Sequence, residues 1–127
     1  MYRLFILFGL IILVRTHAFP ENKTKAESLL QTIKTTTNDS LKAARYLDLS
    51  RLYWDDSLEL CNNYAMEGLK IARKIHSGYL KYHACRNLGH AFMGGGDLIK
   101  SYYYCKQGFK EAKLLRDDKK IADIVVE

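Results

Sequence analysis

The chain has little proline and no regular pattern of cysteine. Pro20 is its only proline, so no later position carries the ring that breaks a helix. The three cysteines, Cys61, Cys85 and Cys105, are odd in number and have no CxxC spacing, so the sequence supports neither a disulfide framework nor a zinc site. All three fall in apolar helical patterns, and we expect them to be small buried side chains. A Cys85–Cys105 bridge is the one disulfide that we consider.

Long apolar runs are also absent. A membrane-spanning helix needs about 20 consecutive apolar residues, and the longest run, residues 4–14, is shorter. Arg3 precedes this run, and small residues suited to cleavage after Ala18 follow it, which is the layout of a secretory signal peptide. We therefore expect a mature protein, residues 19–127, that is exported to the periplasm or secreted and does not contact a membrane. The alternative is that residues 1–18 remain as a membrane anchor.

Strong charge of one sign is lacking as well. The formal net charge is +6, and the basic residues are not interleaved with aromatic residues as in a nucleic-acid groove. We therefore expect no nucleic-acid partner. The densest basic group lies near an expected helix end, where cations suit the helix dipole; it consists of Lys106, Lys110, Lys113, Arg116, Lys119 and Lys120.

The sequence does have helical periodicity, with apolar residues at three- and four-residue spacing along the whole chain. This pattern predicts an all-α protein with helices over residues 25–36, 41–54, 58–75, 79–92, 98–115 and 119–126. Thr24 and Glu27 fit a capping box at the start of the first helix, and Asp97 is suited to cap the fifth. The expected apolar face of the second helix consists of Leu41, Ala44, Leu49, Leu52 and Tyr53.

Two parts of the chain resemble each other. Residues 46–54 match residues 85–93 at an offset of 39, and residues 64–73 match residues 104–113 at an offset of 40. The difference of one residue falls in the turn between the two helices. Two helices per unit at a near-constant period indicate stacked helix pairs.

The second unit resembles the tetratricopeptide repeat family. That repeat has a Leu-Gly pair and an aromatic residue three positions later in its first helix, and a Gly-Asp-like turn follows. The matching residues here are Leu88, Gly89, Phe92, Gly96 and Asp97. In its second helix the family prefers alanine where this chain has Ser101 and Gly108.

The resemblance implies an α-solenoid of antiparallel helix pairs, with two repeats, a leading helix and a partial third repeat. Residues 19–38 would form the leader and N-terminal helix, and residues 39–127 the repeat domain. The unfinished third repeat would leave a C-terminal edge through which copies could associate.

The resemblance also implies a binding surface. In this family the first helix of each pair lines a concave groove, so we expect a non-catalytic module that binds a protein or peptide partner. The residues expected to face the groove are Leu47, Arg51, Trp54, His83, Arg86, Asn87, His90 and Met93. Tryptophan and arginine are enriched at interaction hot spots. The alternative is that Trp54 packs against the leading helix and that the arginines are only solvated.

A second functional hypothesis concerns signalling. The chain is similar to exported repeat proteins of Bacteroidetes-type bacteria, in which such repeats often form the periplasmic sensor region of histidine kinases or regulators. The chain would then be the truncated N-terminal sensor region of a longer protein.

No pattern points to catalysis, a cofactor or a metal. Gly94–Asp97 is neither preceded by an expected strand nor followed by the Gly-Lys-Ser/Thr of a phosphate-binding loop, so we expect a turn there. His83 and His90 would be about 10 Å apart along one helix, which is too far to share one metal ion. No serine or cysteine has a histidine at a spacing that argues for a catalytic pair, and we expect no enzyme activity. Among the three consecutive tyrosines, we expect Tyr103 to be partly exposed.

Overall fold

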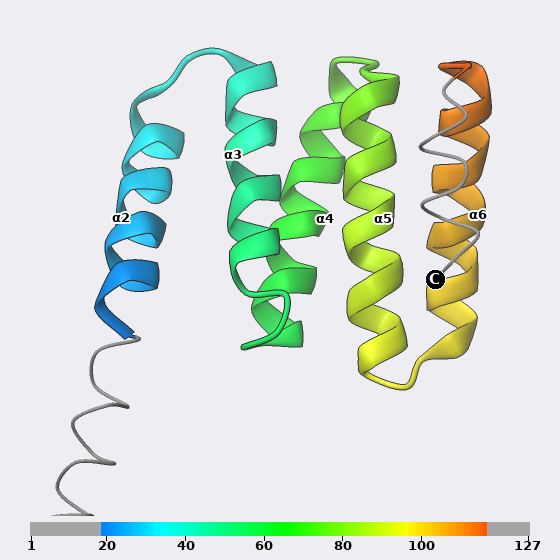
Figure 1. Cartoon of the computed structure of the whole chain (residues 1–127). Helices are drawn as coiled ribbons and strands as arrows, with labels where there is room; N and C mark the ends of the chain where they lie inside the picture. The colour runs from blue at the N-terminus through cyan, green and yellow to red at the C-terminus, as the bar shows by residue number, and fades with distance from the viewer. Residues whose placement is uncertain (1–18, 117–127) are drawn as a thin grey trace, which may run out of the picture.

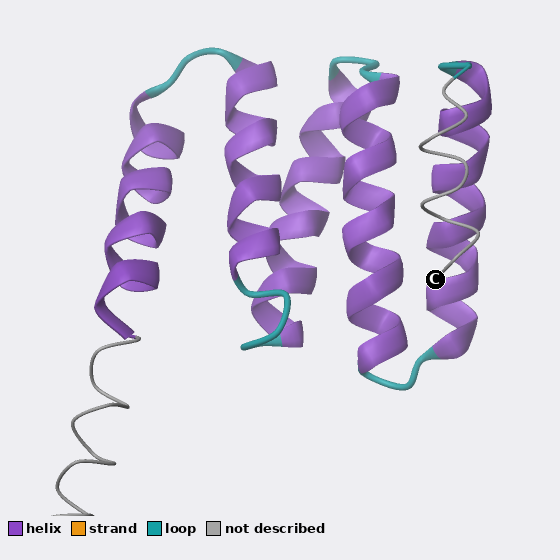
Figure 2. Cartoon of the chain, in the orientation of Figure 1, coloured by secondary structure: helices purple, strands orange, loops and turns teal. Residues whose placement is uncertain are grey.

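The computed structural model describes residues 19–116. These residues form five α-helices and no strand (Figure 2), which confirms the all-α class. The helices are α2 (Phe19–Thr35), α3 (Asp39–Leu52), α4 (Leu58–Lys74), α5 (Gly78–Gly94) and α6 (Leu98–Leu114). The expected signal peptide, residues 1–18, and the sixth expected helix, residues 119–126, lie outside the described residues.

The helices stand side by side in chain order, and consecutive helices run in opposite directions (Figure 1). Each helix packs against the next one, and α3 also contacts α5. In Figure 1 α4 passes behind α3 and α5. As a result, α3 and α5 share one side of the molecule.

A capping side chain marks the start of each helix from α3 onward. Each of these side chains accepts a hydrogen bond from the backbone N–H three residues later. The four residues are Asn38, Ser57, Ser77 and Asp97, and the bond lengths are 2.9, 3.3, 3.3 and 3.0 Å in that order. Each bond pairs an N–H that has no partner inside its own helix. The expectation that Asp97 caps the fifth helix is therefore confirmed.

The first helix begins earlier than the capping pattern predicted. α2 begins at Phe19, so Thr24 lies inside the helix and is not its N-cap. Pro20 suits the first turn of a helix, because the N–H that proline lacks would be unpaired there anyway. Glu21 places an acid in the same turn, where negative charge suits the helix dipole.

The glycine cluster forms the turn between α5 and α6. Gly96 has a φ of 80°, a left-handed conformation that glycine adopts without steric penalty. The N–H of Asp97 donates to the carbonyl of Phe92 at 2.9 Å, and the N–H of Gly96 donates to that of Met93 at 3.0 Å. These bonds pair carbonyls at the end of α5, and the expected turn is confirmed.

The main core lies where α3, α4 and α5 meet. Its buried members combine small and large side chains: Ala43, Leu47, Ala65, Leu69, Ala72, Leu80, Ala84, Cys85 and Leu88. The small residues let the helices approach, and the leucines fill the space beside them. The approach is close at Gly68, where an added Cβ atom would lie 2.7 Å from Cδ2 of Leu47.

The apolar face of α3 agrees in part with the expected one. Of the five residues expected on it, Leu49 is fully buried, and Ala44, Leu52 and Tyr53 are partly buried against the core clusters. The helix buries Leu49 toward α2, whereas Ala43 and Leu47 belong to the core shared with α4 and α5. Because α3 is packed on two sides, its apolar residues do not form a single stripe, and the periodicity did not select Ala43 and Leu47.

The two helix pairs, α3 with α4 and α5 with α6, repeat the same ring contact. Tyr53 stacks on Tyr64 with ring centroids 5.9 Å apart, and Phe92 stacks on Tyr104 at 5.5 Å. The offsets of 39 and 40 residues found in the sequence relate these four positions. The described helices are therefore repeat-like in their packing as well as in their sequence.

A buried serine hydroxyl joins the two helices of each pair. The hydroxyl of Ser50 donates to the carbonyl of Cys61 at 2.8 Å, and the hydroxyl of Ser101 donates to the carbonyl of Gly89 at 2.9 Å. By the same offsets, Ser50 is equivalent to Gly89 and Cys61 to Ser101. The hydrogen bond is thus kept, although the donor lies on the first helix in one pair and on the second in the other.

The three cysteines are free thiols, so a Cys85–Cys105 bridge is not formed. Cys61 and Cys85 are buried as expected, and Cys105 is half-buried. Burial raises the pKa of the Cys85 thiol to about 12. This thiol is therefore protonated at neutral pH, in the form that is a poor nucleophile.

Gly89→Ala should destabilise the fold by about 1–3 kcal/mol, because a Cβ atom at Gly89 would lie 2.7 Å from Sγ of Cys105 and overpack the contact between α5 and α6. Urea denaturation measures the change. Adding Cys105→Ala should recover part of the loss, since it removes the sulfur. The control is Gly95→Ala, where φ is −81° and the nearest atom to the added Cβ, the carbonyl oxygen of Ala91, would lie 3.4 Å away; its effect should stay within about 0.5 kcal/mol. Equal unfolding midpoints for the two glycine variants would contradict the packing argument.

Candidate functional site

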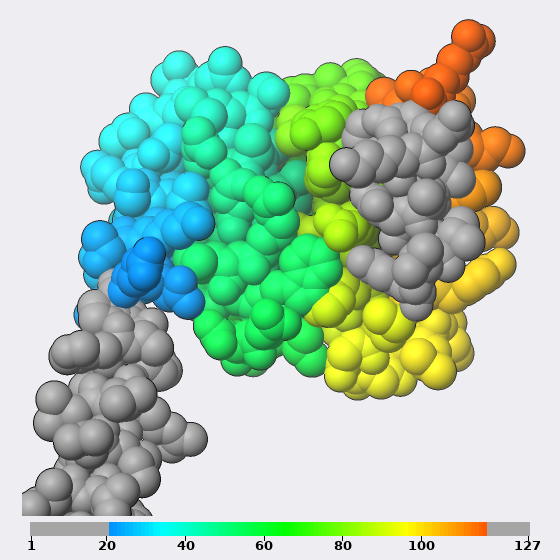
Figure 3. Space-filling view, in the orientation of Figure 1, coloured from blue at the N-terminus to red at the C-terminus, as the bar shows by residue number. Residues whose placement is uncertain are grey.

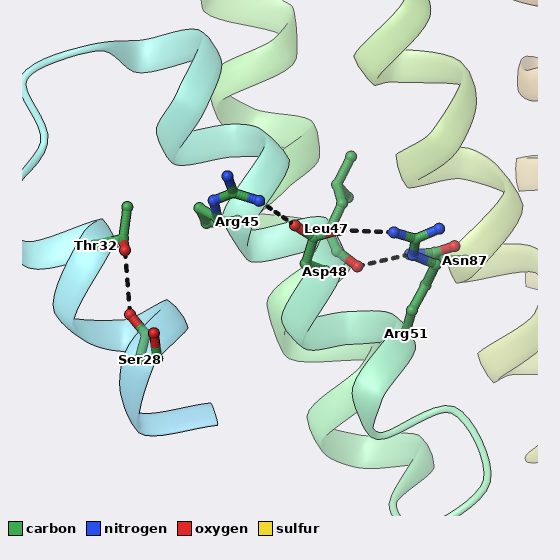
Figure 4. A network of polar contacts seen from close by, with 7 residues as sticks. All are labelled: Ser28, Thr32, Arg45, Leu47, Asp48, Arg51 and Asn87. Atoms are coloured by element: carbon green, nitrogen blue, oxygen red, sulfur yellow. Dashed lines mark hydrogen bonds and ion pairs between the residues drawn. The ribbon is translucent and has the colours of Figure 1, made fainter. Parts of the chain in front are cut away.

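Two of the eight residues expected to face a groove, Leu47 and Asn87, are almost fully buried, although both line a small pocket between α3 and α5. Leu47 belongs to the main core. The side-chain amide of Asn87 donates to the carbonyl of Leu47 at 3.4 Å (Figure 4) and to the hydroxyl of Ser50 at 3.2 Å. An amide tolerates burial when its hydrogen bonds are made, and here it ties α5 to α3 from the inside.

Trp54, Arg86 and His90 form one cluster, which joins the end of α3 to α5. The ring centroids of Trp54 and His90 are 4.2 Å apart, and the guanidinium carbon of Arg86 lies 5.2 Å from the centroid of Trp54. All three residues are half-buried. A cation over an indole ring is attracted by the negative face of the ring. Trp54 therefore packs against residues of α5.

Arg51 and His83 line a small pocket between α3 and α5. The volume of this pocket is about 110 Å³, and its other lining residues are Ala44, Leu47, Asp48, Tyr79, Leu80 and Asn87. Sites for drug-sized ligands measure about 300–1,000 Å³. The pocket therefore has room for one side chain of a partner and not for a large cofactor.

Asp48 is an acid of this surface that the sequence analysis did not select. Its carboxylate forms ion pairs with Arg45 at 2.8 Å and with Arg51 at 2.7 Å, one on each side (Figure 4). Both arginines lie three residues from Asp48, a spacing at which helical side chains meet, so the sequence did contain the signal. Partly exposed pairs of this kind add about 0–1 kcal/mol to stability, and their main effect here is to orient Arg51.

Tyr79 is a second residue that the sequence analysis did not select. Its ring lies 4.5 Å from that of His83, edge to face. The two residues are four positions apart, so they share one face of α5. Met93, which was selected, is exposed at the other end of α5 and does not line the pocket.

The polar and aromatic residues on the side shared by α3 and α5 make one surface, which we call the α3–α5 face. It consists of Asp48, Arg51, Trp54, Tyr79, His83, Arg86 and His90. Rings and guanidinium groups predominate, and the carboxylate of Asp48 is already paired. Such groups recognise a ligand by stacking, by hydrogen-bond donation and by positive charge.

Comparison with protein-family models, curated proteins and solved structures finds no match to this chain. Within residues 19–116, no three side chains of His, Cys, Asp or Glu gather closely enough to hold a metal ion. No helix formed by these residues combines the length and the apolar character needed to cross a bilayer.

Asn87→Ala should destabilise the fold by about 1–3 kcal/mol, because the buried carbonyl of Leu47 and the hydroxyl of Ser50 lose a donor. The change is measured by urea denaturation. Asn63→Ala on the exposed side of α4 is the matched control, with an expected effect within about 0.5 kcal/mol. If both asparagine variants unfolded at the wild-type urea concentration, Asn87 would not hold α3 and α5 together.

Proposed function

We propose that this chain is a non-catalytic interaction module of the tetratricopeptide type, an α-solenoid of antiparallel helix pairs that binds a protein or peptide segment across the α3–α5 face. The observation that carries the proposal is the cluster of Trp54, Arg86 and His90. This cluster spans two helix pairs on the side that α3 and α5 share. Tryptophan and arginine are the residue types that most often dominate binding energy at interfaces.

The repeated contacts support the repeat architecture. The ring pair and the buried serine bond recur at equivalent positions of the two helix pairs. The direct contact of α3 with α5 agrees with stacking in which the first helices of successive pairs lie side by side. The motif from Leu88 to Asp97 is the sequence feature that links this architecture to the tetratricopeptide family.

The way the face is held supports binding rather than simple solvation of its residues. Asn87 fixes α5 to α3, Asp48 orients Arg51, and Arg86 lies over Trp54. A surface that is already ordered loses less conformational entropy when it binds. The 110 Å³ pocket would take one side chain of the bound segment, and the Trp54 cluster would contact its neighbours.

Export is part of the proposal. Arg3, the apolar residues 4–14 and a cleavage site after Ala18 support a signal peptide. The partner would then be a protein of the periplasm or of the cell exterior.

The test uses peptides selected from a random library displayed on phage, with the mature chain as the target. Trp54→Ala and Arg86→Ala should each weaken the binding of the selected peptides at least about tenfold, which corresponds to about 1.4 kcal/mol, because they remove the anchor of the face. Fluorescence anisotropy measures the affinity, and circular dichroism checks that the helices remain. Lys70→Ala, on the exposed side of α4, is the control and should bind as the wild type does. Peptides that bind both face variants with wild-type affinity would place recognition elsewhere.

A further inference from the structure

The outward side of α6 exposes large apolar side chains. Leu98, Ile99, Tyr102 and Tyr103 are 68, 85, 70 and 50% exposed. The expected exposure of Tyr103 is thus confirmed, and Tyr102 is more exposed still. Figure 3 shows the yellow and orange surface of α6 at the edge of the described residues opposite α2. Exposed apolar groups that gather in one place mark interaction sites more often than scattered ones do.

The other helix pair provides an internal control for this exposure. α4 occupies the same place in the first pair as α6 does in the second, and it precedes α6 by 40 residues. The residues of α4 that are equivalent to Ile99, Tyr102 and Tyr103 are Glu59, Asn62 and Asn63, in that order. On α4 these positions hold an acid and two amides, of which Asn62 is half-buried, whereas α6 has one aliphatic and two aromatic side chains there.

The charge of the two outer faces differs too. Lys106, Lys110 and Lys113 are exposed on α6, and no ion pair among residues 19–116 involves them. The only acid of α6, Glu111, binds Lys81 of α5 at 2.8 Å. α4 also carries the cations Lys70 and Arg73, but it has two acids, Glu59 and Glu67, that offset their charge.

The apolar and cationic residues form one surface with two ends. We call it the α6 outer face, and it consists of Ile99, Tyr102, Tyr103, Lys106, Lys110 and Lys113. Its members recur at three- and four-residue spacing, so they lie on one side of the helix. At 1.5 Å of rise per residue, the surface is about 21 Å long. Its N-terminal end is apolar and its C-terminal end is positive.

We propose that the α6 outer face binds a helix of a partner protein whose contacting side is apolar at one end and acidic at the other. Apolar side chains at one end of that helix would cover Ile99 and Tyr102, and carboxylates at its other end would pair with the lysines. A helix presents side chains at the same three- and four-residue spacing, so it can match the surface along its length. This site is separate from the α3–α5 face and does not depend on the function proposed for it.

The surface fits two other occupants less well. In a two-fold contact between two copies of the chain, Lys106 would lie near Lys106 of the other copy, and Lys113 would lie against the apolar end. A helix that lies on an anionic membrane keeps its apolar and basic residues on different sides along its whole length. Here both kinds share one side and are separated along the axis.

The probes are two synthetic helical peptides of about 20 residues, a length at which helices are stable enough to compare. One carries leucines at three- and four-residue spacing in one half and glutamates at the same spacing in the other half. The second replaces each glutamate with lysine. At about 0.1 M salt, the wild-type chain should bind the acidic peptide at least about tenfold more tightly than the basic one.

Charge reversal tests the cationic end. Lys110→Glu with Lys113→Glu should reverse the preference, so that the basic peptide binds and the acidic one does not. The matched control is Lys70→Glu with Arg73→Glu at the equivalent positions of α4, which should leave the preference unchanged. If the α6 variant kept the wild-type affinity for the acidic peptide, or if the acidic peptide did not bind the wild type, the proposal would be wrong.

The apolar end has its own test. Ile99→Glu with Tyr102→Asn and Tyr103→Asn gives α6 the residues of α4, and it should abolish binding of the acidic peptide while the circular dichroism spectrum stays the same. Light scattering and vesicles of phosphatidylcholine with phosphatidylserine test the other occupants. A wild-type dimer that this variant makes monomeric, or vesicle binding without peptide binding, would overturn the proposal.

Discussion

Leu47 joins three helices, and the rest of the structure depends on how it is held. Its side chain packs against the bare backbone of Gly68 on α4, and its carbonyl accepts the amide of Asn87 on α5. The first contact sets how closely α3 and α4 approach, and the second sets the position of α5 beside α3. Because the three helices are fixed at this point, the side chains on their outer surfaces have fixed positions as well.

The fixed position of the three helices decides which polar residues of the α3–α5 face are buried and which lie at the surface. A neutral amide can be buried when a carbonyl and a hydroxyl pair with it, as they do at Asn87, whereas a buried guanidinium needs a full set of charged or polar partners. Arg51 therefore lies at the surface with Asp48, and Arg86 lies over Trp54. The α3–α5 face therefore presents positive charge and aromatic surface on a support that Asn87 keeps in place.

The two helix pairs agree inside and differ outside. The ring stacks and the buried serine bonds recur because the volume between two close helices admits few arrangements. The side chains on the outer faces are not restricted by a neighbouring helix, and those of α4 and α6 differ in both polarity and charge. Glu59 and Asn63 on α4 correspond to Ile99 and Tyr103 on α6. The difference between pairs with equivalent interiors points to a role for the α6 outer face that packing does not require.

The sequence by itself determined the helices after the first one, the cap at Asp97 and the repeat, because each of these depends on residues close together in the chain or on a regular spacing along it. Asp97 and Lys100, for example, are three positions apart. The resemblance to the tetratricopeptide repeat also implied that Trp54, Arg86 and His90 lie on one surface. Only the tertiary structure decided that Leu47 and Asn87 lie inside and that α3 buries two faces. The bond between those two residues spans 40 positions, and a side chain becomes buried when a distant helix covers it, which short-range periodicity does not encode.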